Sequence, residues 1–394
     1  MLPLRRHTKT ISIGSIKIGG DEPIRIQSML TCDTTDVDSC VEEITRLDAV
    51  DCEIIRLTVP NQKSVDSVPL IREEMRNRGI ERSIVADVHF NPNLAVNVCE
   101  FVDKVRINPG NYADRKKFEV REYTETQYQE ELDRIEQKLI PLIKNLKKYG
   151  NSLRVGTNHG SLSDRLMNRY GDTPEGMVES AMEFLRILRK HDFEETVLSM
   201  KSSNPMVMIG SYRKLVKKMD KEDMHYPLHL GVTEAGNELD GRIKSAIGIG
   251  TLLCEGLGDT IRVSLTEPSE NEIPVAKSIL QSTRSRIFNT DFISCPSCGR
   301  TFFDLARTTD KIKSRTSHLK GVKIAIMGCV VNGPGEMADA DFGYVGSGAD
   351  KINLFHGKTC VSRNIPAEHA VDHLIELIQK CGMWSDPPEN NKKK

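Results

Sequence analysis

The sequence predicts an α/β TIM barrel followed by a smaller α+β domain, and three observations support this prediction. Eight short apolar or β-branched runs alternate with segments of helical periodicity between residues 24 and 267. Polar side chains stand at the C-terminal ends of nearly all these runs. After Pro268 the alternation stops, and "FISCPSCGR" follows. We expect the barrel at 1–285, the second domain at 286–387 and a disordered tail at 388–394.

The order of the runs matches a barrel of β-then-α units. The segments between them have helical features, such as Val41, Ile44 and Leu47 on one face, or Thr173 as a cap with Pro174 at the first helical position. Eight such units in about 250 residues are typical of a TIM barrel. The strand-like runs are IRIQSM (24–29), CEIIRLTV (52–59), RSIVADV (82–88), KVRINPG (104–110), LRVGTN (153–158), TVLSMKS (196–202), PLHLGVTE (227–234) and DTIRVSLTE (259–267).

Two further segments belong to the predicted barrel domain. "TISIGSIKIGG" alternates around Gly14-Ser15, which predicts an N-terminal hairpin at 8–20. Residues 111–150 form a helical insertion after the fourth strand, with Leu132, Ile135, Leu139, Leu142 and Leu146 on one face. We expect the insertion to be a lid or packing helix without chemistry of its own.

The polar residues at the strand ends predict an anion-binding cavity. C-terminal strand ends meet at the barrel mouth, where TIM-barrel enzymes place their active sites. Four arginines and a lysine in one cavity favour a ligand with several negative charges, such as a phosphate or diphosphate. The strand-end residues are Gln27, Ser28, Arg56, Asp87, His89, Arg106, Asn108, Arg154, Asn158, Lys201, Ser203, His229, Thr233, Glu234, Arg262 and Ser264.

Composition excludes several classes of partner. The formal net charge is -1, so no global basic field favours nucleic acid or an anionic membrane. No run approaches the length of a membrane span. The ten cysteines are irregularly spread, which suits a reducing compartment, and we expect a cytoplasmic protein.

Three cysteines of the second domain form a candidate metal centre. Cys295 and Cys298 are two residues apart on a turn, and Cys329 lies in "IMGCVVNGPGE". Zinc would need a fourth soft donor, whereas three thiolates with a weakly held fourth position are typical of a 4Fe-4S cluster that does chemistry. The spacing does not decide the fourth ligand, for which Cys360, Cys381 and Glu336 are the candidates.

The motifs resemble those of a known family. "ISCPSCGRT", "IAIMGCVVNGPGEMADADFGYVG", "ADVHFN", "VRINPGN", "RVGTNHGSL", "SMKSSN" and "LHLGVTEAG" are similar to 4-hydroxy-3-methylbut-2-enyl diphosphate synthases of the methylerythritol phosphate route to isoprenoids. The resemblance extends from about Arg6 to Pro387. It implies a TIM barrel joined to a ferredoxin-like domain of the sulfite-reductase type.

The resemblance also implies an activity and cofactor. Family members open and dehydrate 2-C-methyl-D-erythritol 2,4-cyclodiphosphate with two electrons from ferredoxin or flavodoxin. Their 4Fe-4S cluster has three Cys ligands and one Glu ligand. The corresponding cluster ligands here are Cys295, Cys298, Cys329 and Glu336.

The family's substrate site can be carried over in the same way. Glu234 resembles the acid near the reacting carbon. Glu336 is also expected to act in catalysis, because iron releases a carboxylate more easily than a thiolate. The residues that match substrate-binding positions are Arg56, Asp87, Arg106, Asn108, Arg154, Asn158, Lys201, His229, Arg262 and Ser264.

The chain departs from one branch of the family. The 111–150 segment resembles the plant-type branch, which carries a large extra domain between barrel and cluster domain, but the stretch present there is too short to form one. Either this is a natural two-domain form or the insert is missing. In the two-domain form of the family, the cluster domain caps the barrel of the other subunit. We therefore expect a head-to-tail homodimer.

Two alternatives from other classes stay open. One is a zinc-stabilised phosphate-binding barrel with structural cysteines, which iron and sulfide in the protein would exclude. The other is an electron-transfer scaffold, which would favour four thiolates and leave the basic strand ends without a purpose.

Overall fold

The computed structural model describes residues 4–113, 123–301, 303–331, 333–337 and 339–387. It divides into two compact units, Met1–Arg286 and Ile287–Lys394. The expected tail at 388–394 lies outside the described residues. Among the described helices, none is long and apolar enough to cross a membrane.

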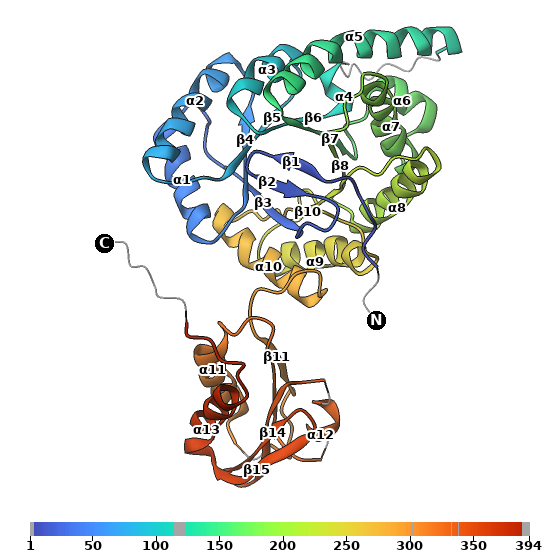
Figure 1. Cartoon of the computed structure of the whole chain (residues 1–394). Coiled ribbons are helices and arrows are strands. Elements are labelled where there is room, and N and C mark those ends of the chain that lie inside the picture. The colour runs from blue at the N-terminus through green and yellow to red at the C-terminus, as the bar shows by residue number, and fades with distance from the viewer. Residues whose placement is uncertain (1–3, 114–122, 302, 332, 338, 388–394) are drawn as a thin grey trace. The chain divides into compact units, whose positions relative to one another are not determined.

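The first unit contains a parallel barrel, as predicted. Its strands follow the order β8-β7-β6-β5-β4-β3-β10-β9, and a parallel bridge between Leu198 and Leu228 joins the two ends. Figure 1 shows the helices as a ring around these strands. The strands are β3 (Arg25–Met29), β4 (Ile54–Val59), β5 (Ser83–Val88), β6 (Lys104–Ile107), β7 (Ser152–Asn158), β8 (Thr196–Lys201), β9 (His229–Leu230) and β10 (Thr260–Ile261).

The helices of this unit begin at the polar residues that precede them. Asp36 accepts a hydrogen bond from Ser39 N at the start of the first helix, and Thr173 accepts one from Gly176 N. The helices are α1 (Val37–Ala49), α2 (Gln62–Asn77), α3 (Pro92–Val98), α4 (Pro109–Tyr112), α5 (Glu125–Tyr149), α6 (Asp164–Tyr170), α7 (Pro174–Lys190), α8 (Pro205–Lys221), α9 (Glu238–Cys254) and α10 (Glu272–Ser282), with short 3₁₀ turns η1 (Cys99–Phe101) and η2 (Ser269–Asn271).

The N-terminal hairpin consists of β1 (Ile11–Ile13) and β2 (Ile16–Ile18). It covers the end of the barrel that faces the viewer in Figure 1. Its isoleucines form one apolar cluster with Ile54, Val85 and Val197. Because these three residues lie near the N-terminal ends of their strands, the hairpin closes the end opposite the expected mouth.

Three expectations about element boundaries are wrong. Pro109 begins α4 instead of ending a strand, because Asn108 Oδ1 accepts the first free N–H, that of Gly110. The seventh strand ends at Leu230, and Glu234, still inside the predicted run, has a φ of 54°, which extended backbone cannot contain. The eighth ends at Ile261, and Leu265, still inside its predicted run, donates its N–H to the Glu272 carboxylate.

The described part of the segment at 111–150 lies in the outer helical layer. Its α5 connects β6 to β7 and contacts α3, η1 and α7. The buried residues include Ile135, Leu139, Leu142 and Leu146. Helix α5 therefore packs as a helix of the ring. Residues 114–122 lie outside the described part.

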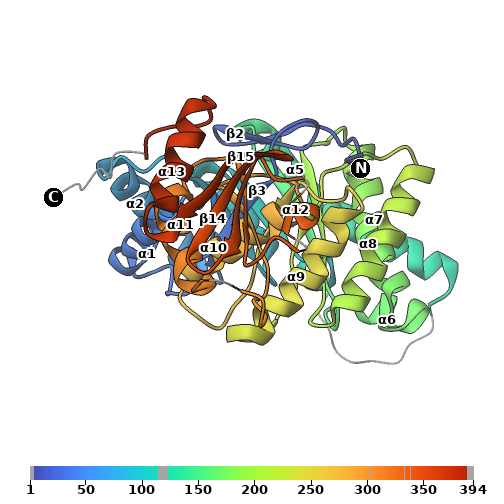
Figure 2. The same cartoon turned by 90° about the horizontal axis from the view of Figure 1, so that it is seen from below.

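The second unit is a five-stranded mixed sheet with helices on both faces. Strands β11 (Asp291–Ser294), β12 (Lys323–Met327) and β13 (Phe342–Gly348) are parallel, whereas β14 (Lys351–His356) and β15 (Thr359–Pro366) are antiparallel to their neighbours. Helices α11 (Leu305–Thr316) and α13 (Ala367–Lys380) lie on one face and α12 (Gly333–Glu336) on the other (Figure 2).

The sequence pattern predicts strands at GVKIAIMG (321–328) and DKINLFHG (350–357) and a helix at 365–382, which correspond to β12, β14 and α13, but it does not predict β11, β13 or β15. Strand β13 contains three glycines, which weaken any strand prediction. They are tolerated because neighbouring groups pack where side chains would stand: a Cβ on Gly343 would meet Met337 Cε at 2.3 Å. Strand β15 is an edge strand with mostly exposed or polar residues, so it lacks an apolar alternation.

Candidate functional site

Charged side chains point into the barrel because alternate residues of each strand face the same side. On β6 and at Asn108, the residue that follows it, polar Lys104, Arg106 and Asn108 alternate with Val105 and Ile107, and all are buried. Side chains at alternate positions point to the same face of a strand, so the polar set of β6 faces the inside of the barrel. Lys104 was missed by sequence reasoning, although the same alternation identifies it.

Asp87 and Arg106 form the centre of a buried network. Arg106 Nη1 donates to Asp87 Oδ1 at 2.9 Å, and Nη2 donates to the Gly156 carbonyl at 2.9 Å. Arg56 Nη2 lies 3.7 Å from Asp87 Oδ2. Burial raises the pKa of Asp87, but the charges of Arg106 and Arg56 outweigh it and hold that pKa well below its usual range. Asp87 is therefore ionised at neutral pH.

The network continues to the third strand end. His89 Nε2 lies 2.9 Å from Arg106 Nη1 and 3.4 Å from Asp87 Oδ2, and His89 Nδ1 lies 3.3 Å from Asn111 Nδ2. A neutral imidazole cannot accept at both nitrogens, so the tautomer decides which of these two contacts the ring accepts. His89 is a polar side chain beside Arg106 at this strand end.

Positive charge exceeds the negative charge around Asp87. Arg154 is 1% exposed and Lys201 is 6% exposed. Burial, followed by repulsion from neighbouring arginines, lowers the pKa values of both groups well below their usual range. Burial also lowers the pKa of Arg56 to about 10, although Asp87 opposes this. Buried charges that repel each other cost free energy until an anion pairs with them.

Several buried donors lack partners among the described residues. They include Arg154 Nε and Nη1, Arg106 Nε and Lys104 Nζ. A buried donor without an acceptor is unfavourable by about 1–3 kcal/mol, so these groups favour a ligand or water that accepts hydrogen bonds. The barrel interior therefore has the charge and the free donors that a small polyanion requires.

Two glycines, which sequence reasoning missed, make room for the cationic side chains. A Cβ on Gly156 would lie 2.6 Å from Arg106 Nε, and one on Gly231 would lie 2.7 Å from the Arg262 carbonyl oxygen and 2.9 Å from Lys201 Nζ. Neither glycine has a positive φ, so the space and not the backbone conformation requires glycine. Gly156 and Gly231 lie two residues beyond Arg154 and His229, on the same strand face as these polar residues, and this spacing was the signal in the sequence that could have identified them.

The other predicted substrate residues differ in their surroundings. The Asn108 side chain caps α4, so its Oδ1 is already used, whereas Asn158 Oδ1 has no partner among the described residues. His229 is buried with Nδ1 2.8 Å from Thr260 Oγ1, and its Nε2 has no such partner. Burial, then the charges of Arg154 and Lys201, lowers the pKa of His229 well below its usual range.

The strand ends β9 and β10 carry the remaining candidates. Arg262 Nη2 lies 3.3 Å from Glu272 Oε1, an ion pair that the sequence did not reveal. Ser264 is half-buried, and Glu234 is exposed. The left-handed φ of Glu234 is strained for a residue with a Cβ, and such strain is often found at functional sites.

In the second unit, the four predicted cluster ligands line one cavity of about 180 Å³. Cys295, Cys298, Cys329 and Glu336 share it with Arg300. Cys360 and Cys381 are not among the described lining residues. Cys360 packs against the apolar cluster around Met337, and Cys381 packs against the larger cluster under α13.

The local structure suits thiolates. The N–H of Gly328 donates to Cys295 Sγ at 3.2 Å. Hydrogen bonds from the backbone and then the side chain of Arg300 lower the pKa of Cys298. Arg300 also interacts electrostatically with Cys329 and Glu336. Arg300 is therefore a cation that compensates the negative charge of this ligand set.

The donor set has the chemistry of iron–sulfur cluster ligands. Among the described residues, no group of three or more His, Cys, Asp or Glu is arranged to hold one metal ion. An iron–sulfur cluster is bound through separate iron atoms, so its ligands need to surround a space and not converge on a point. Three thiols, one carboxylate and a hydrogen bond to sulfur around one cavity meet this requirement.

These features define the class of protein: a TIM barrel with an interior lined by buried cationic side chains, joined in one chain to a second domain with a cysteine-lined cavity. Comparison with known families agrees, since the model "GcpE TIM-barrel domain" matches residues 8–277 and "GcpE protein C-terminal domain" matches residues 291–380.

Curated relatives cover nearly the whole chain. It is 52% identical over 385 residues to "4-hydroxy-3-methylbut-2-en-1-yl diphosphate synthase (ferredoxin)" of Prochlorococcus marinus subsp. pastoris, covering 97% of this chain and 95% of the relative. It is 51% identical to the protein of the same name from a Synechococcus strain, covering 98% and 96%. The chain belongs to this family of synthases and is an oxidoreductase of isoprenoid biosynthesis. The predicted family, fold class and enzyme class are confirmed.

Proposed function

We propose that the enzyme converts 2-C-methyl-D-erythritol 2,4-cyclodiphosphate to (E)-4-hydroxy-3-methylbut-2-enyl diphosphate. The reaction opens the ring, removes water and consumes two electrons. The observation that supports it most is the excess of buried cations around Asp87 inside the barrel: Arg56, Arg106, Arg154 and Lys201. Among the described residues, donors of Arg106 and Arg154 also lack partners. A cyclic diphosphate supplies two negative charges in a compact volume and many acceptor oxygens.

The chain's own residues provide binding and proton transfer. The arginines and Lys201 bind the diphosphate, with Asn158 and Ser264 beside it. Asp87 keeps Arg106 oriented through their 2.9 Å hydrogen bond. Glu234, exposed at the end of the seventh strand, donates the proton that the leaving oxygen needs.

A 4Fe-4S cluster bound by Cys295, Cys298, Cys329 and Glu336 would supply the two electrons to the substrate. Ferredoxin is the donor that the relatives' names indicate, and flavodoxin is the second candidate. We further propose a head-to-tail homodimer in the cytoplasm of a bacterium, with the cluster domain of one subunit serving the barrel of the other.

The test is anaerobic purification of the full chain, followed by iron and sulfide analysis and turnover of the cyclodiphosphate with reduced ferredoxin. We expect about four irons and four sulfides per chain and formation of the linear diphosphate. Zinc without iron, or a cluster without turnover, would contradict the proposal.

Variants of the candidate ligands sharpen this test. Cys329→Ala should lose the iron, and Glu336→Ala should lose activity and change the cluster spectrum. The control variants Cys360→Ala and Cys381→Ala should keep both iron and activity, because neither residue lines the cavity. If Cys360→Ala loses the cluster while Glu336→Ala keeps it and its activity, the fourth ligand is wrongly assigned.

A further inference from the structure

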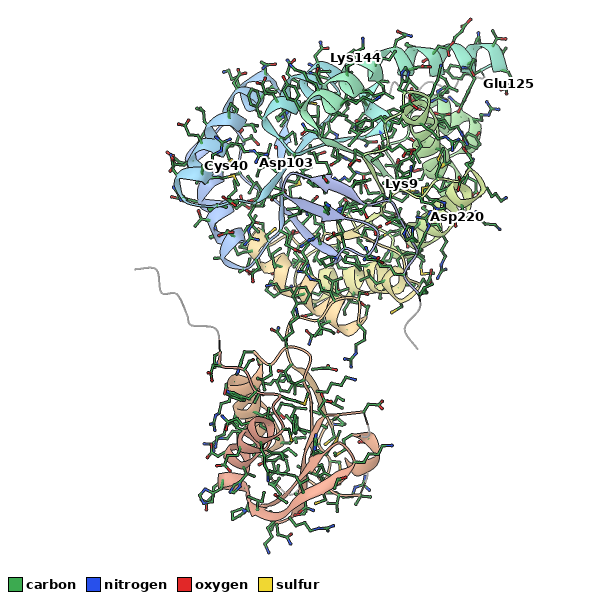
Figure 3. The ribbon with its side chains drawn as sticks, viewed as in Figure 1. Lys9, Cys40, Asp103, Glu125, Lys144 and Asp220 are labelled. Atoms are coloured by element: carbon green, nitrogen blue, oxygen red, sulfur yellow. The ribbon has the colours of Figure 1, made fainter. Side chains whose placement is uncertain are left out.

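Two cysteine thiols of the barrel unit lie in contact near the end of its first strand. Cys32 is half-buried in the loop between β3 and α1, and Cys40 is buried in α1. Their Sγ atoms are 3.3 Å apart. Cys40 is labelled on its blue helix in Figure 3. A disulfide bond is about 2.05 Å long, so an approach of about 1.3 Å joins the two sulfurs.

The surroundings keep both groups protonated. The N–H groups of Thr31 and Cys32 donate to the Glu43 carboxylate at 3.0 and 3.3 Å, which places a negative charge beside the pair. Burial, and then Cys40, raises the pKa of Cys32. Burial also raises the pKa of Cys40. Both thiols are therefore weak nucleophiles at neutral pH, and their exchange with a disulfide reagent becomes faster as pH rises.

The same loop supports the anion site. Leu30 N donates to the Arg56 carbonyl at 2.8 Å, and Thr34 Oγ1 donates to the Thr58 carbonyl at 2.7 Å. Met29 Sδ, just before the loop, lies 3.1 Å from Arg56 Nε. A displacement of Cys32 is therefore expected to shift the end of β3 and the Met29 side chain, both of which contact Arg56.

We propose that Cys32 and Cys40 are a redox modification site: a small-molecule disulfide oxidises them to an intramolecular disulfide, and this weakens anion binding in the barrel. Cys32, the more accessible thiol, attacks one sulfur of the reagent while its proton passes to the neighbouring Glu43 carboxylate, and the reagent releases one thiolate. Because the pKa of Cys32 is raised, this attack is slow at neutral pH and becomes faster as pH rises. The Cys40 sulfur then displaces the second thiol. Two protein thiols lose two electrons and two protons, and the reagent gains them as two thiols.

The sequence allows a direct test. Trypsin releases residues 26–46 as one peptide, whose only cysteines are Cys32 and Cys40. The full-length protein is treated anaerobically with oxidised glutathione, alkylated and digested. We expect this peptide to be two hydrogen masses lighter and to resist alkylation, and dithiothreitol should reverse both changes. An unchanged peptide, or a stable glutathione adduct on it, would overturn the proposal.

The effect on the barrel is measured by calorimetric titration with pyrophosphate, a step that rests on the proposed function. Oxidation should weaken binding about three- to tenfold, and this response should be absent in Cys32→Ser and Cys40→Ser. The control Cys254→Ser, which changes an exposed cysteine elsewhere, should respond as the unmodified chain does. If the oxidised and reduced chains bind pyrophosphate with equal affinity, the proposed effect of the disulfide on anion binding is wrong.

The two proposals fail in distinguishable ways. If the reduced chain does not bind pyrophosphate at all, the proposed anion site is contradicted, and the disulfide is judged by the peptide mass alone.

Discussion

Single residues decide how the barrel interior holds its charges. Gly156 leaves the space that Arg106 occupies between Asp87 and the Gly156 carbonyl. Asp87 in turn is the carboxylate against which Arg106 and Arg56 are placed. Small changes at these positions should therefore alter anion binding, and removal of the Asp87 charge should also lower the stability of the barrel.

We expect Gly156→Ala to weaken pyrophosphate binding at least about tenfold, or 1.4 kcal/mol. The new methyl group would stand 2.6 Å from Arg106 Nε and displace the guanidinium. Titration calorimetry measures the change. Gly210→Ala in α8 is the matched control, since a Cβ there meets nothing within 4 Å. Equal affinities for the two variants would contradict the assigned position of Arg106.

Asp87→Asn should destabilise the barrel by about 3–5 kcal/mol at pH 7, because it leaves two buried arginines without their carboxylate. The folded-state pKa of Asp87 is depressed, so its contribution is complete above the ordinary pKa of about 3.9 and is lost as pH falls below it. Denaturant unfolding should show a constant difference between the two chains from pH 7 to about 5 that shrinks below about 4. A difference that is largest in acid would refute this.

At the scale of elements, the β13 strand shapes the cysteine loop that follows β12. A Cβ on Gly346 would lie 2.3 Å from the Gly328 carbonyl, and Gly328 is the residue whose N–H donates to Cys295 Sγ. Gly346 therefore sets how closely the loop before Cys329 approaches the sheet. Backbone atoms are in the way, so a methyl group there cannot be accommodated by turning a side chain.

Gly346→Ala should reduce the iron content to less than about half and broaden the visible spectrum, because hydrogen bonds to sulfur and ligand position govern cluster binding. The control is Gly348→Ala, two residues further along the same strand, where a Cβ meets nothing within 4 Å. Iron analysis and circular dichroism of both variants provide the measurement. Unchanged iron in Gly346→Ala would show that the loop tolerates displacement.

At the scale of the whole molecule, the anion site and the cysteine cavity lie in different compact units of one chain. The proposed dimer brings the cluster of one subunit to the barrel of the other. Such an arrangement has a direct consequence for mixed dimers, because each active site then uses residues of two chains.

Lys201→Met and Cys329→Ala should each be inactive alone, but dissociated and reassembled together they should recover about one quarter of the normal activity. Half of the random dimers are mixed, and each mixed dimer has one of its two sites intact. Activity is measured with reduced ferredoxin, and sedimentation verifies the dimer. An active monomer, or no recovery from a mixed population, would contradict the head-to-tail arrangement.

The sequence by itself determined the alternation of eight strands, the amphipathic helices and the candidates for anion binding and cluster ligation. These are local properties, because strand and helix periods, caps and motif spacings depend on neighbouring residues. The family and the enzyme class were also predictable, since the motifs "ISCPSCGRT" and "ADVHFN" are contiguous.

Only the tertiary structure decided what depends on distances between remote segments. It placed Glu336, and not Cys360 or Cys381, at the cysteine cavity. It identified β13 and β15, whose residues are stabilised by pairing and not by their own propensity. It brought Gly156 against Arg106 and Cys32 against Cys40. No periodicity encodes such contacts, because they form when separate elements close around shared space.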